Sequence, residues 1–371
     1  LRWIRSTTIF ELFKAVKIYF KLRKQDQWMA NRFNEINPHL AISNGDRHGG
    51  LEPAFLKQAT KYSIKIIVPY FSNSGIQGPL KTQLGRRLVE RTWKSPLITH
   101  LLYYTMGHQF YNKKYLFFDP SMTLALKLFG TLSNYPWQIG AGLVTNVCVD
   151  SQNTWNRYHL NGLDKEKLNL VGETNHPDIY RGFKNKDEIK AKILGKYGMA
   201  SEKKCIICSL PQLYEHGFAD EATHWEEMNF LTKSLSEHCN LLISLHPKMN
   251  RNSYVFLEKK FGVRILNEPL KNVIAIADLF VATFSSTIYW SILCEVPSIV
   301  VDFYGFNYDA FDFFSSIDIV KEKTALSEIV FKKLHSKTDF QNDWKELSRD
   351  VIFNDQTINR YFKLIQNEQN L

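Results

Sequence analysis

Short apolar runs alternate with longer amphipathic segments along most of the chain. The runs have the length of buried strands and occupy residues 40–44, 64–69, 142–149, 168–171, 205–210, 241–245, 278–283 and 298–301. Between them, segments such as 52–62 and 225–238 place apolar side chains at helical spacing. Strands that alternate with helices form parallel sheets joined by right-handed crossovers. The pattern therefore predicts an α/β fold with parallel sheets.

The same pattern indicates where the chain divides. A chain of 371 residues is too long for one ordinary core, so two domains are expected. Strand-like runs lie on both sides of a polar stretch at 173–186, which we interpret as a linker. We expect an N-terminal domain over 1–172, a second domain over 187–330 and C-terminal helices over 331–371.

Polar residues follow two runs of the second domain, which end in His246-Pro247-Lys248 and in Ser285-Ser286-Thr287. Parallel sheets bind ligands at the carboxyl ends of their strands, so both groups are expected at the ligand edge. Three hydroxyls at a helix start favour a phosphate, and His246 and Lys248 would add positive charge. Such a set stabilises a departing nucleotide phosphate without a metal. The alternatives are helix capping by the hydroxyls alone and a structural strand-end histidine.

A loop after the run 205–210 carries further candidates, namely Gln212, Glu215 and His216. We interpret it as a donor-binding or domain-closing loop; a metal site and a solvated acidic helix face are the alternatives. Cys205 and Cys208 have the spacing of a zinc pair, but they lie inside a strand-like run and no second pair follows. We therefore expect no metal and no cofactor.

In the first domain, the run 40–44 leads into a glycine-flanked loop that contains Asp46, Arg47 and His48. An acid, a guanidinium and an imidazole at the end of a strand favour a catalytic or acceptor-binding loop. The alternative is a turn in which Asp46 merely caps a helix. We expect the general base to be His48, oriented by Asp46, or Asp46 itself, and we assign Arg47 to the acceptor.

The positive charge of the chain lies in its N-terminal part. Residues 1–150 carry 20 Lys and Arg against 8 Asp and Glu, whereas the rest carries 27 against 29. Segment 8–24 alternates aromatic or aliphatic residues with lysines, which indicates either a helix in the membrane interface or an ordinary basic helix. Arg86 and Arg87 either bind a phosphate-bearing acceptor or lie on a solvated face. No DNA or RNA recognition motif is present, so we expect no nucleic-acid partner.

Three segments resemble a known group of enzymes. They are residues 147–180, with a pattern of glycine and acidic residues before the linker, the sequence ISLHPK at 243–248, and residues 277–304, with the paired serines. They are similar to the GT-B fold of nucleotide-sugar glycosyltransferases, in particular bacterial sialyl-, polysialyl- and Kdo-type transferases and glycerophosphate polymerases. The resemblance implies two Rossmann-like domains facing across a cleft, the first for the acceptor and the second for the nucleotide sugar. It also implies that His246, Pro247 and the 285–287 hydroxyls hold the nucleotide and its phosphate.

One position departs from the resemblance. Many UDP-sugar enzymes of this kind carry a ribose-binding Glu in the helix after the serines, where this chain has Trp290. The resemblance therefore implies a CMP-activated acidic sugar ahead of a UDP-sugar. UDP-N-acetylglucosamine 2-epimerases share the architecture and form the alternative.

The sequence thus predicts a metal-independent glycosyltransferase that acts on a surface glycan or a lipid-linked acceptor. We expect it in the cytoplasm, held peripherally at the inner face of the membrane. A sugar-nucleotide epimerase and a non-enzymatic basic binding protein are the competing hypotheses.

Overall fold

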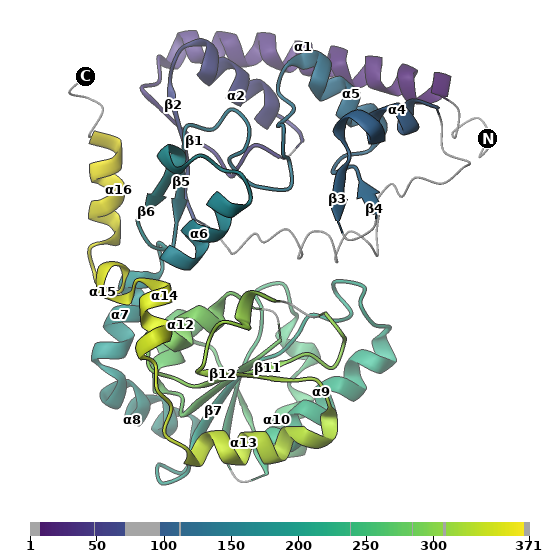
Figure 1. Ribbon diagram of the computed structural model, residues 1–371. Helices are drawn as coiled ribbons and strands as arrows, with labels where there is room; N and C mark the ends of the chain where they lie inside the picture. The colour runs from purple at the N-terminus through teal and green to yellow at the C-terminus, as the bar shows by residue number, and fades with distance from the viewer. Residues whose placement is uncertain are drawn as a thin grey trace. The chain divides into compact units, whose positions relative to one another are not determined.

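The computed structural model describes residues 8–47, 49–70, 97–110, 113–237, 239–283, 285–306 and 309–366. These residues form two compact units (Figure 1). Unit 1 takes the chain up to Val149 together with Thr154–Leu170, and unit 2 takes Asp150–Asn153 together with the chain from Val171.

Unit 1 is built on a parallel sheet in the order β1-β2-β5-β6. Its strands are β1 Leu40–Ile42, β2 Lys65–Val68, β5 Asn146–Val149 and β6 Leu168–Leu170. A separate antiparallel pair joins β3 His108–Phe110 to β4 Lys113–Tyr115. The helices are α1 Thr8–Ile36, α2 Glu52–Lys61, α4 Leu97–Met106, α5 Pro120–Phe129 and α6 Gln152–Leu160, the last of which begins in unit 2, with the short 3-10 turn η2 Lys165–Lys167.

Helix α1 extends well beyond the predicted segment 8–24 and runs along the edge of unit 1 (Figure 1). Its buried side chains are Ala15, Leu22, Met29 and Phe33, which share one face because spacings of seven and four residues are close to two turns and one turn of helix. This face packs against α5 and α2. The length of the helix follows from that continuous apolar stripe.

Unit 2 contains a six-stranded parallel sheet in the order β12-β11-β10-β7-β8-β9. Its strands are β7 Cys205–Ser209, β8 Asn240–Ser244, β9 Arg264–Ile265, β10 Leu279–Ala282, β11 Ser298–Val301 and β12 Ile317–Val320. In chain order this is the doubly wound arrangement, in which the first strand lies beside the fourth. The two parallel sheets confirm the predicted α/β fold with two Rossmann-like units.

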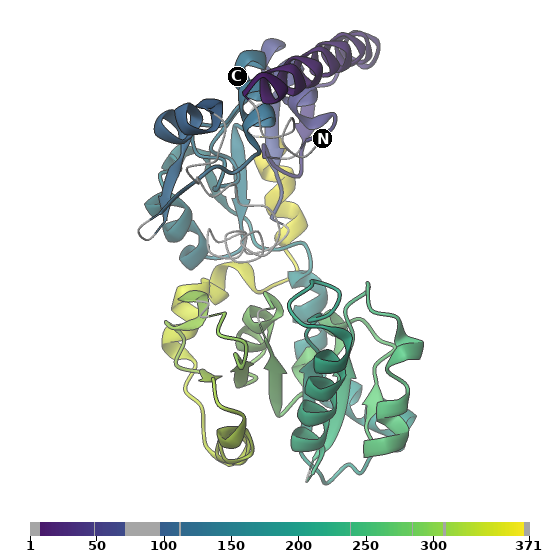
Figure 2. The ribbon, with the colours of Figure 1, turned by 90° about the vertical axis from the view of Figure 1, so that its right-hand side faces the viewer.

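Helices cover both faces of the unit 2 sheet (Figure 2). The helices of unit 2 are α7 His176–Lys184, α8 Lys186–Tyr197, α9 Glu221–Ser236, α10 Phe256–Phe261, α11 Leu270–Val273, α12 Thr287–Leu293, α13 Leu326–His335, α14 Gln341–Leu347, α15 Arg349–Ile352 and α16 Thr357–Gln366. Alternate strand residues such as Ile206 and Cys208 join a core with side chains of α9, α10 and α13. The stretch 173–186, interpreted from the sequence as a linker, contains α7.

Arg360 of α16 ties the C-terminal tail to the start of unit 2. Its guanidinium donates to the carbonyl oxygens of Val171, Val351 and Ile352, at 2.8 Å, 3.0 Å and 3.1 Å. None of these three carbonyl groups belongs to a β-strand, so the Arg360 guanidinium supplies the donors that a neighbouring strand would otherwise provide.

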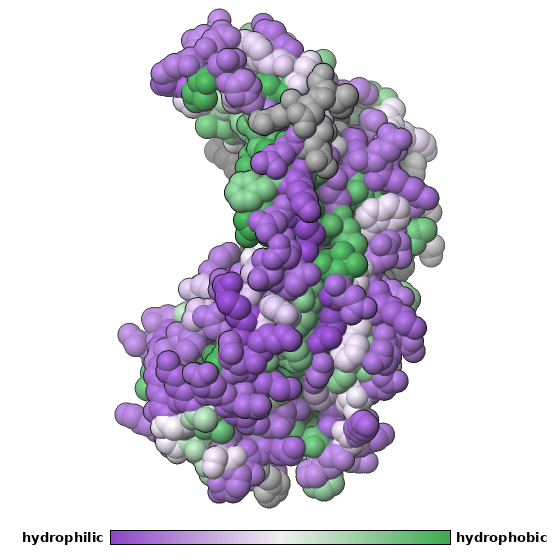
Figure 3. All heavy atoms as spheres, turned by 90° about the vertical axis from the view of Figure 1, so that its left-hand side faces the viewer, coloured by the Kyte–Doolittle hydropathy of each residue, from purple (hydrophilic) through white to green (hydrophobic). Residues whose placement is uncertain are grey.

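The exposed surface differs between the units. In the described parts of the chain, most exposed large apolar side chains belong to unit 1. On the face drawn in Figure 3, hydrophilic residues cover most of unit 2. None of the helices in the described ranges is both long and apolar enough to cross a membrane.

Candidate functional site

The unit 2 sheet reverses its strand order between β7 and β10, and the crevice of such sheets opens at this point, at the carboxyl ends. Cys208 of β7 pairs with Val281 of β10 and with Ile243 of β8. Gln212, Ser285 and Pro247 each lie four residues beyond these paired positions. The register therefore brings the three predicted donor-binding segments to one edge of the sheet.

Gln212 is the most unusual side chain at this edge. It is buried, and its Nε2 makes no hydrogen bond to any described residue. A buried amide donor without a partner costs free energy, on the order of 1–3 kcal/mol. Such a group at the switch point of a sheet suits a hydrogen bond to an acceptor atom of a ligand.

The His246 imidazole is fixed in one tautomer. Its Nδ1 accepts a hydrogen bond from the backbone N–H of Lys248 at 3.1 Å, so the proton of the neutral ring sits on Nε2. His246, Pro247 and Lys248 are all exposed at the end of β8. Partial burial lowers the pKa of His246, and the positive charges of Lys248 and His216 lower it further. Nε2–H is therefore a donor available to a ligand.

Glu215 and His216 lie close enough to His246 for their charges to act on its imidazole, with Glu215 raising the pKa and His216 lowering it. Glu215 accepts a hydrogen bond from the hydroxyl of the buried Tyr254 at 3.1 Å. That hydroxyl lies 2.8 Å from Nε2 of the buried His224. The chain His224–Tyr254–Glu215 thus anchors the loop beside His246.

Asp220 and His224 follow the loop for which a metal site was one alternative, and the structure gives both side chains other roles. Asp220 caps α9 by accepting from the backbone N–H of Thr223 at 2.8 Å. His224 is turned into the core toward Tyr254. Within the described ranges, no group of three or more His, Cys, Asp or Glu side chains could hold a metal ion. Cys205 and Cys208 lie three residues apart on one strand and therefore point to opposite faces of the sheet.

The hydroxyl groups after β10 partly satisfy one another. Ser285 Oγ lies 2.7 Å from Thr287 Oγ1 and accepts from the Thr287 backbone N–H at 3.3 Å. Ser286 occupies the N-cap position of α12 but makes no side-chain capping bond. Capping therefore does not use the Ser286 hydroxyl, which is partly exposed at the ligand edge.

Glu173 is a buried carboxylate that the sequence analysis did not single out. Its Oε2 accepts from Trp290 Nε1 and its Oε1 from Asn175 Nδ2, both at 2.7 Å. Burial raises its pKa to about 7, and the negative charge of Asp150 adds to the rise. Only its place shortly after β6 could have indicated from the sequence that Glu173 belongs to a site, because nothing in the sequence pairs it with Trp290.

In unit 1, Asp46 holds the backbone of a neighbouring loop. Its buried carboxylate accepts from the backbone N–H groups of Gly140, at 2.9 Å, and of Gly142. Burial raises the pKa of Asp46, and the two glycine N–H groups oppose the rise. Since both oxygens are engaged with backbone, the contacts favour a structural role over the predicted role as base. His48 lies outside the described residues.

Arg47 is also engaged within unit 1. Its guanidinium donates to the Trp137 carbonyl at 3.0 Å and lies over the ring of Phe117. Burial lowers its pKa from the ordinary value. The assignment of Arg47 to the acceptor stays a prediction, and Arg86 and Arg87 lie outside the described residues.

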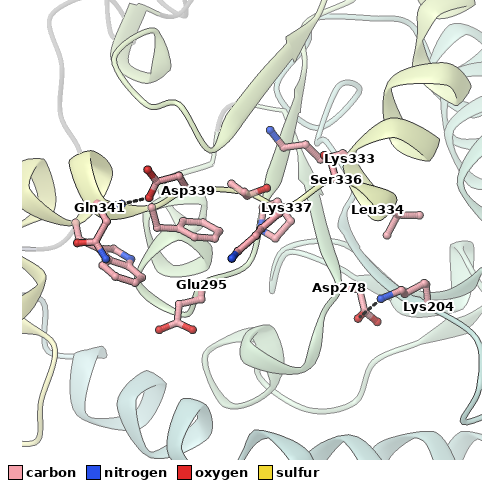
Figure 4. Close-up of a pocket in the computed structure, with 13 residues that line it drawn as sticks. Lys204, Asp278, Glu295, Lys333, Leu334, Ser336, Lys337, Asp339 and Gln341 are labelled. Atoms are coloured by element: carbon pink, nitrogen blue, oxygen red, sulfur yellow. Dashed lines mark hydrogen bonds and ion pairs between the residues drawn. The ribbon is translucent and has the colours of Figure 1, made fainter.

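A pocket of about 780 Å³ opens at the opposite edge of the unit 2 sheet (Figure 4). Lys204, Asp278 and Pro297 line it from the positions just before β7, β10 and β11, and the segment after α13 supplies its other wall. Lys204 and Asp278 form an ion pair there at 3.5 Å. Because ligands of doubly wound sheets bind at the carboxyl ends, we do not take this pocket as the site.

Two Rossmann-like units, the second with its switch point between β7 and β10, define a GT-B class of fold. No protein-family model and no curated protein sequence matches the chain. Solved structures share the fold. UDP-GlcNAc 2-epimerase from Methanocaldococcus jannaschii, in complex with UDP-GlcNAc and UDP, is similar with a TM-score of 0.53 and 12% identity, over 93% of this chain and 80% of that one.

Two further structures are similar to the same degree. The S. aureus MnaA structure with UDP has a TM-score of 0.52 and 12% identity, over 95% of this chain and 82% of that one. A putative UDP-N-acetylglucosamine 2-epimerase from Listeria monocytogenes has a TM-score of 0.51 and 12% identity, over 94% of this chain and 79% of that one. At this identity the likeness establishes the fold.

Proposed function

We propose that this protein is an enzyme that binds a nucleotide-activated sugar in unit 2 and transfers the sugar to an acceptor hydroxyl. One observation carries the proposal. The buried Gln212 Nε2 has no partner among the described residues, and it lies at the switch point of a doubly wound sheet. The solved structures of the same fold that contain UDP or UDP-GlcNAc make a nucleotide sugar the first ligand to test.

The residues around Gln212 suit a leaving nucleotide phosphate. The Ser285, Ser286 and Thr287 hydroxyls offer donors at the end of β10, and His246 offers Nε2–H at the end of β8. Lys248 adds a positive charge at the same edge. Preorganised donors that face developing negative charge lower the barrier to departure of the phosphate, and no metal is required for this.

A CMP-activated acidic sugar is the donor that we favour over a UDP-sugar. Helix α12 carries no carboxylate of its own at the place of Trp290. The nearby Glu173 carboxylate is only 6% exposed, and both its oxygens already accept hydrogen bonds. The Lys248 ammonium and the Nε2–H donor of His246 would instead complement the carboxylate of an acidic sugar.

Sugar transfer is favoured over epimerisation by the surface of unit 1. Its long basic helix α1 exposes apolar side chains, which suits an enzyme whose glycan or lipid-linked acceptor lies at the inner face of the membrane. His48 is proposed as the base that receives the acceptor proton. The second candidate is a sugar-nucleotide epimerase, because epimerases are among the solved structures of this fold.

The test incubates the full chain with CMP-, UDP- and GDP-sugars, with and without a glycan acceptor, and analyses the products. Transfer predicts CMP release that rises when acceptor is added. Conversion of a UDP-sugar to its epimer without any acceptor would identify the second candidate. The proposal would be refuted if the protein neither turned over nor bound any of these donors.

A further inference from the structure

The N-terminal half of α1 exposes a second apolar face. Its exposed side chains are Ile9, Leu12, Phe13, Val16 and Phe20, and Ile9 and Phe13 are 79% and 69% exposed. Their spacing of three, four and seven residues places them in one stripe along three turns of helix. The stripe lies away from the buried stripe of Ala15 and Leu22, which contacts the core of unit 1.

The apolar character of this stripe ends in the middle of the helix. Continuing at the same spacing, the next positions are Arg23, Gln27, Asn31 and Asn34. An ordinary solvated helix face would be polar over its whole length, as the continuation of this face in the second half of α1 is; the exposed Trp28 and Ile36 lie off this face. The first half therefore has a property that the packing of unit 1 does not require.

Lysines border the apolar stripe on one side. Lys17, Lys21 and Lys24 are exposed and are not ion-paired with any described residue. Lys14, by contrast, pairs with Asp119 at 3.5 Å. An anionic bilayer surface can accommodate this arrangement, because the aromatic and aliphatic side chains would enter the acyl boundary while the lysines that are not ion-paired with described residues would lie at the level of the headgroups.

Helix α4 offers a shorter apolar face on the same unit. Leu97, Leu101 and Tyr104 are exposed, and their spacing of four and three residues puts them on one side of the helix. α4 packs against both α1 and α5 (Figure 1). Exposed apolar side chains thus occur on two helices that contact each other.

We propose that the stripe of α1 from Ile9 to Phe20 inserts into the interface of an anionic lipid bilayer, while Lys17, Lys21 and Lys24 contact the lipid headgroups. The inference deepens the proposed function, because it names the surface through which the protein would reach a membrane-bound acceptor. Lipid binding is measured without donor or acceptor, so its failure can be told from failure of sugar transfer.

The test measures co-sedimentation of the full chain with vesicles of phosphatidylcholine, with and without phosphatidylglycerol. The wild type is expected to bind the anionic vesicles. The double variant Phe13→Ser/Phe20→Ser should bind about 100-fold more weakly, since each ring contributes on the order of tenfold when it leaves water. The variant Lys17→Gln/Lys21→Gln should lose about 25-fold on anionic vesicles and nothing on neutral ones.

The matched control is Phe313→Ser/Phe331→Ser in unit 2, whose rings are 71% and 65% exposed. It should bind vesicles like the wild type. All variants should unfold at the wild-type temperature and bind nucleotide normally, because the substituted side chains are exposed and outside the unit 2 site.

The inference is overturned if the wild type ignores anionic vesicles, or if Phe13→Ser/Phe20→Ser binds them unchanged. It is also overturned if the control variant loses binding equally. A wild type that forms dimers without lipid, and that becomes monomeric in the Phe13→Ser/Phe20→Ser variant, would identify the stripe as a protein interface instead.

Discussion

The replacement Gln212→Leu separates the binding role of Gln212 from a structural one. The Gln212 Nε2 is buried and has no hydrogen-bond partner among the described residues, at a cost of about 1–3 kcal/mol. Leucine has nearly the same volume and no polar atom. We therefore expect the free energy of unfolding of the free protein to rise by at least about 1 kcal/mol in urea denaturation.

Nucleotide affinity should move in the opposite direction. A hydrogen bond to a charged group contributes about 1.5–3 kcal/mol, so the loss of the Gln212 donor should weaken CMP binding about 10- to 150-fold. Calorimetric titration of wild type and variant measures this change. A gain in stability together with a loss of affinity is the pattern expected of a group kept for a ligand.

Asn240→Leu is the control for this experiment. Asn240 is also buried in unit 2, but its Nδ2 donates to the carbonyl of Ala200 at 2.5 Å, at the amino end of β8. Its replacement should lower stability by about 1–3 kcal/mol and leave nucleotide affinity unchanged. If Gln212→Leu behaves like this control, Gln212 is a structural residue and the reasoning about the site is wrong.

Three further predictions concern two buried carboxylates and the half-buried Arg360. Burial raises the Glu173 pKa from 4.5 to about 7, so the folded state binds this proton more tightly than the unfolded chain does. The stabilisation from this tighter proton binding is complete below pH 4.5 and is lost as the pH rises through 7. The stability of Glu173→Gln relative to the wild type should therefore rise by about 3 kcal/mol from pH 4.5 to about pH 8, added to a pH-independent cost where the amide faces the Trp290 Nε1 or Asn175 Nδ2 donor, and equal pH profiles would contradict the burial argument. Asp46→Asn should destabilise unit 1 by about 2 kcal/mol, because its amide would face the Gly140 and Gly142 N–H groups. If the variant is as stable as the wild type, Asp46 is free to act as a base. Arg360→Met should lower the stability of unit 2 by more than about 2 kcal/mol in urea, and a smaller loss would mean that water replaces the guanidinium.

Most of the parallel strands could be predicted because they are short apolar runs that end at a polar residue. The sequence places β11 at the residues that the structure assigns to it, and β7, β8 and β10 within one residue at either end. β9 and β12 were missed, since Arg264–Ile265 is only two residues long and Ile317–Val320 carries Asp318 and has no long apolar run. The C-terminal half of α1 was missed because its buried residues are widely spaced among polar ones.

The candidate site could be predicted only in part. The segments at 212, 246 and 285 could be expected at one edge of the sheet, because the carboxyl ends of parallel strands lie at the same edge. The partners of Asp46 could not be foreseen, since Gly140 and Gly142 lie more than ninety residues away in the chain. The same holds for Glu173 and Trp290, which pair across two separate elements.

The central claim is that the carboxyl ends of β7, β8 and β10 bind the nucleotide. A crystal of the full chain soaked with CMP tests this most directly. We predict density for the nucleotide with its phosphate within hydrogen-bonding distance of Gln212 Nε2 and the Ser286 hydroxyl. Nucleotide bound instead in the pocket near Lys204 and Asp278, at the amino ends of the strands, would contradict the account.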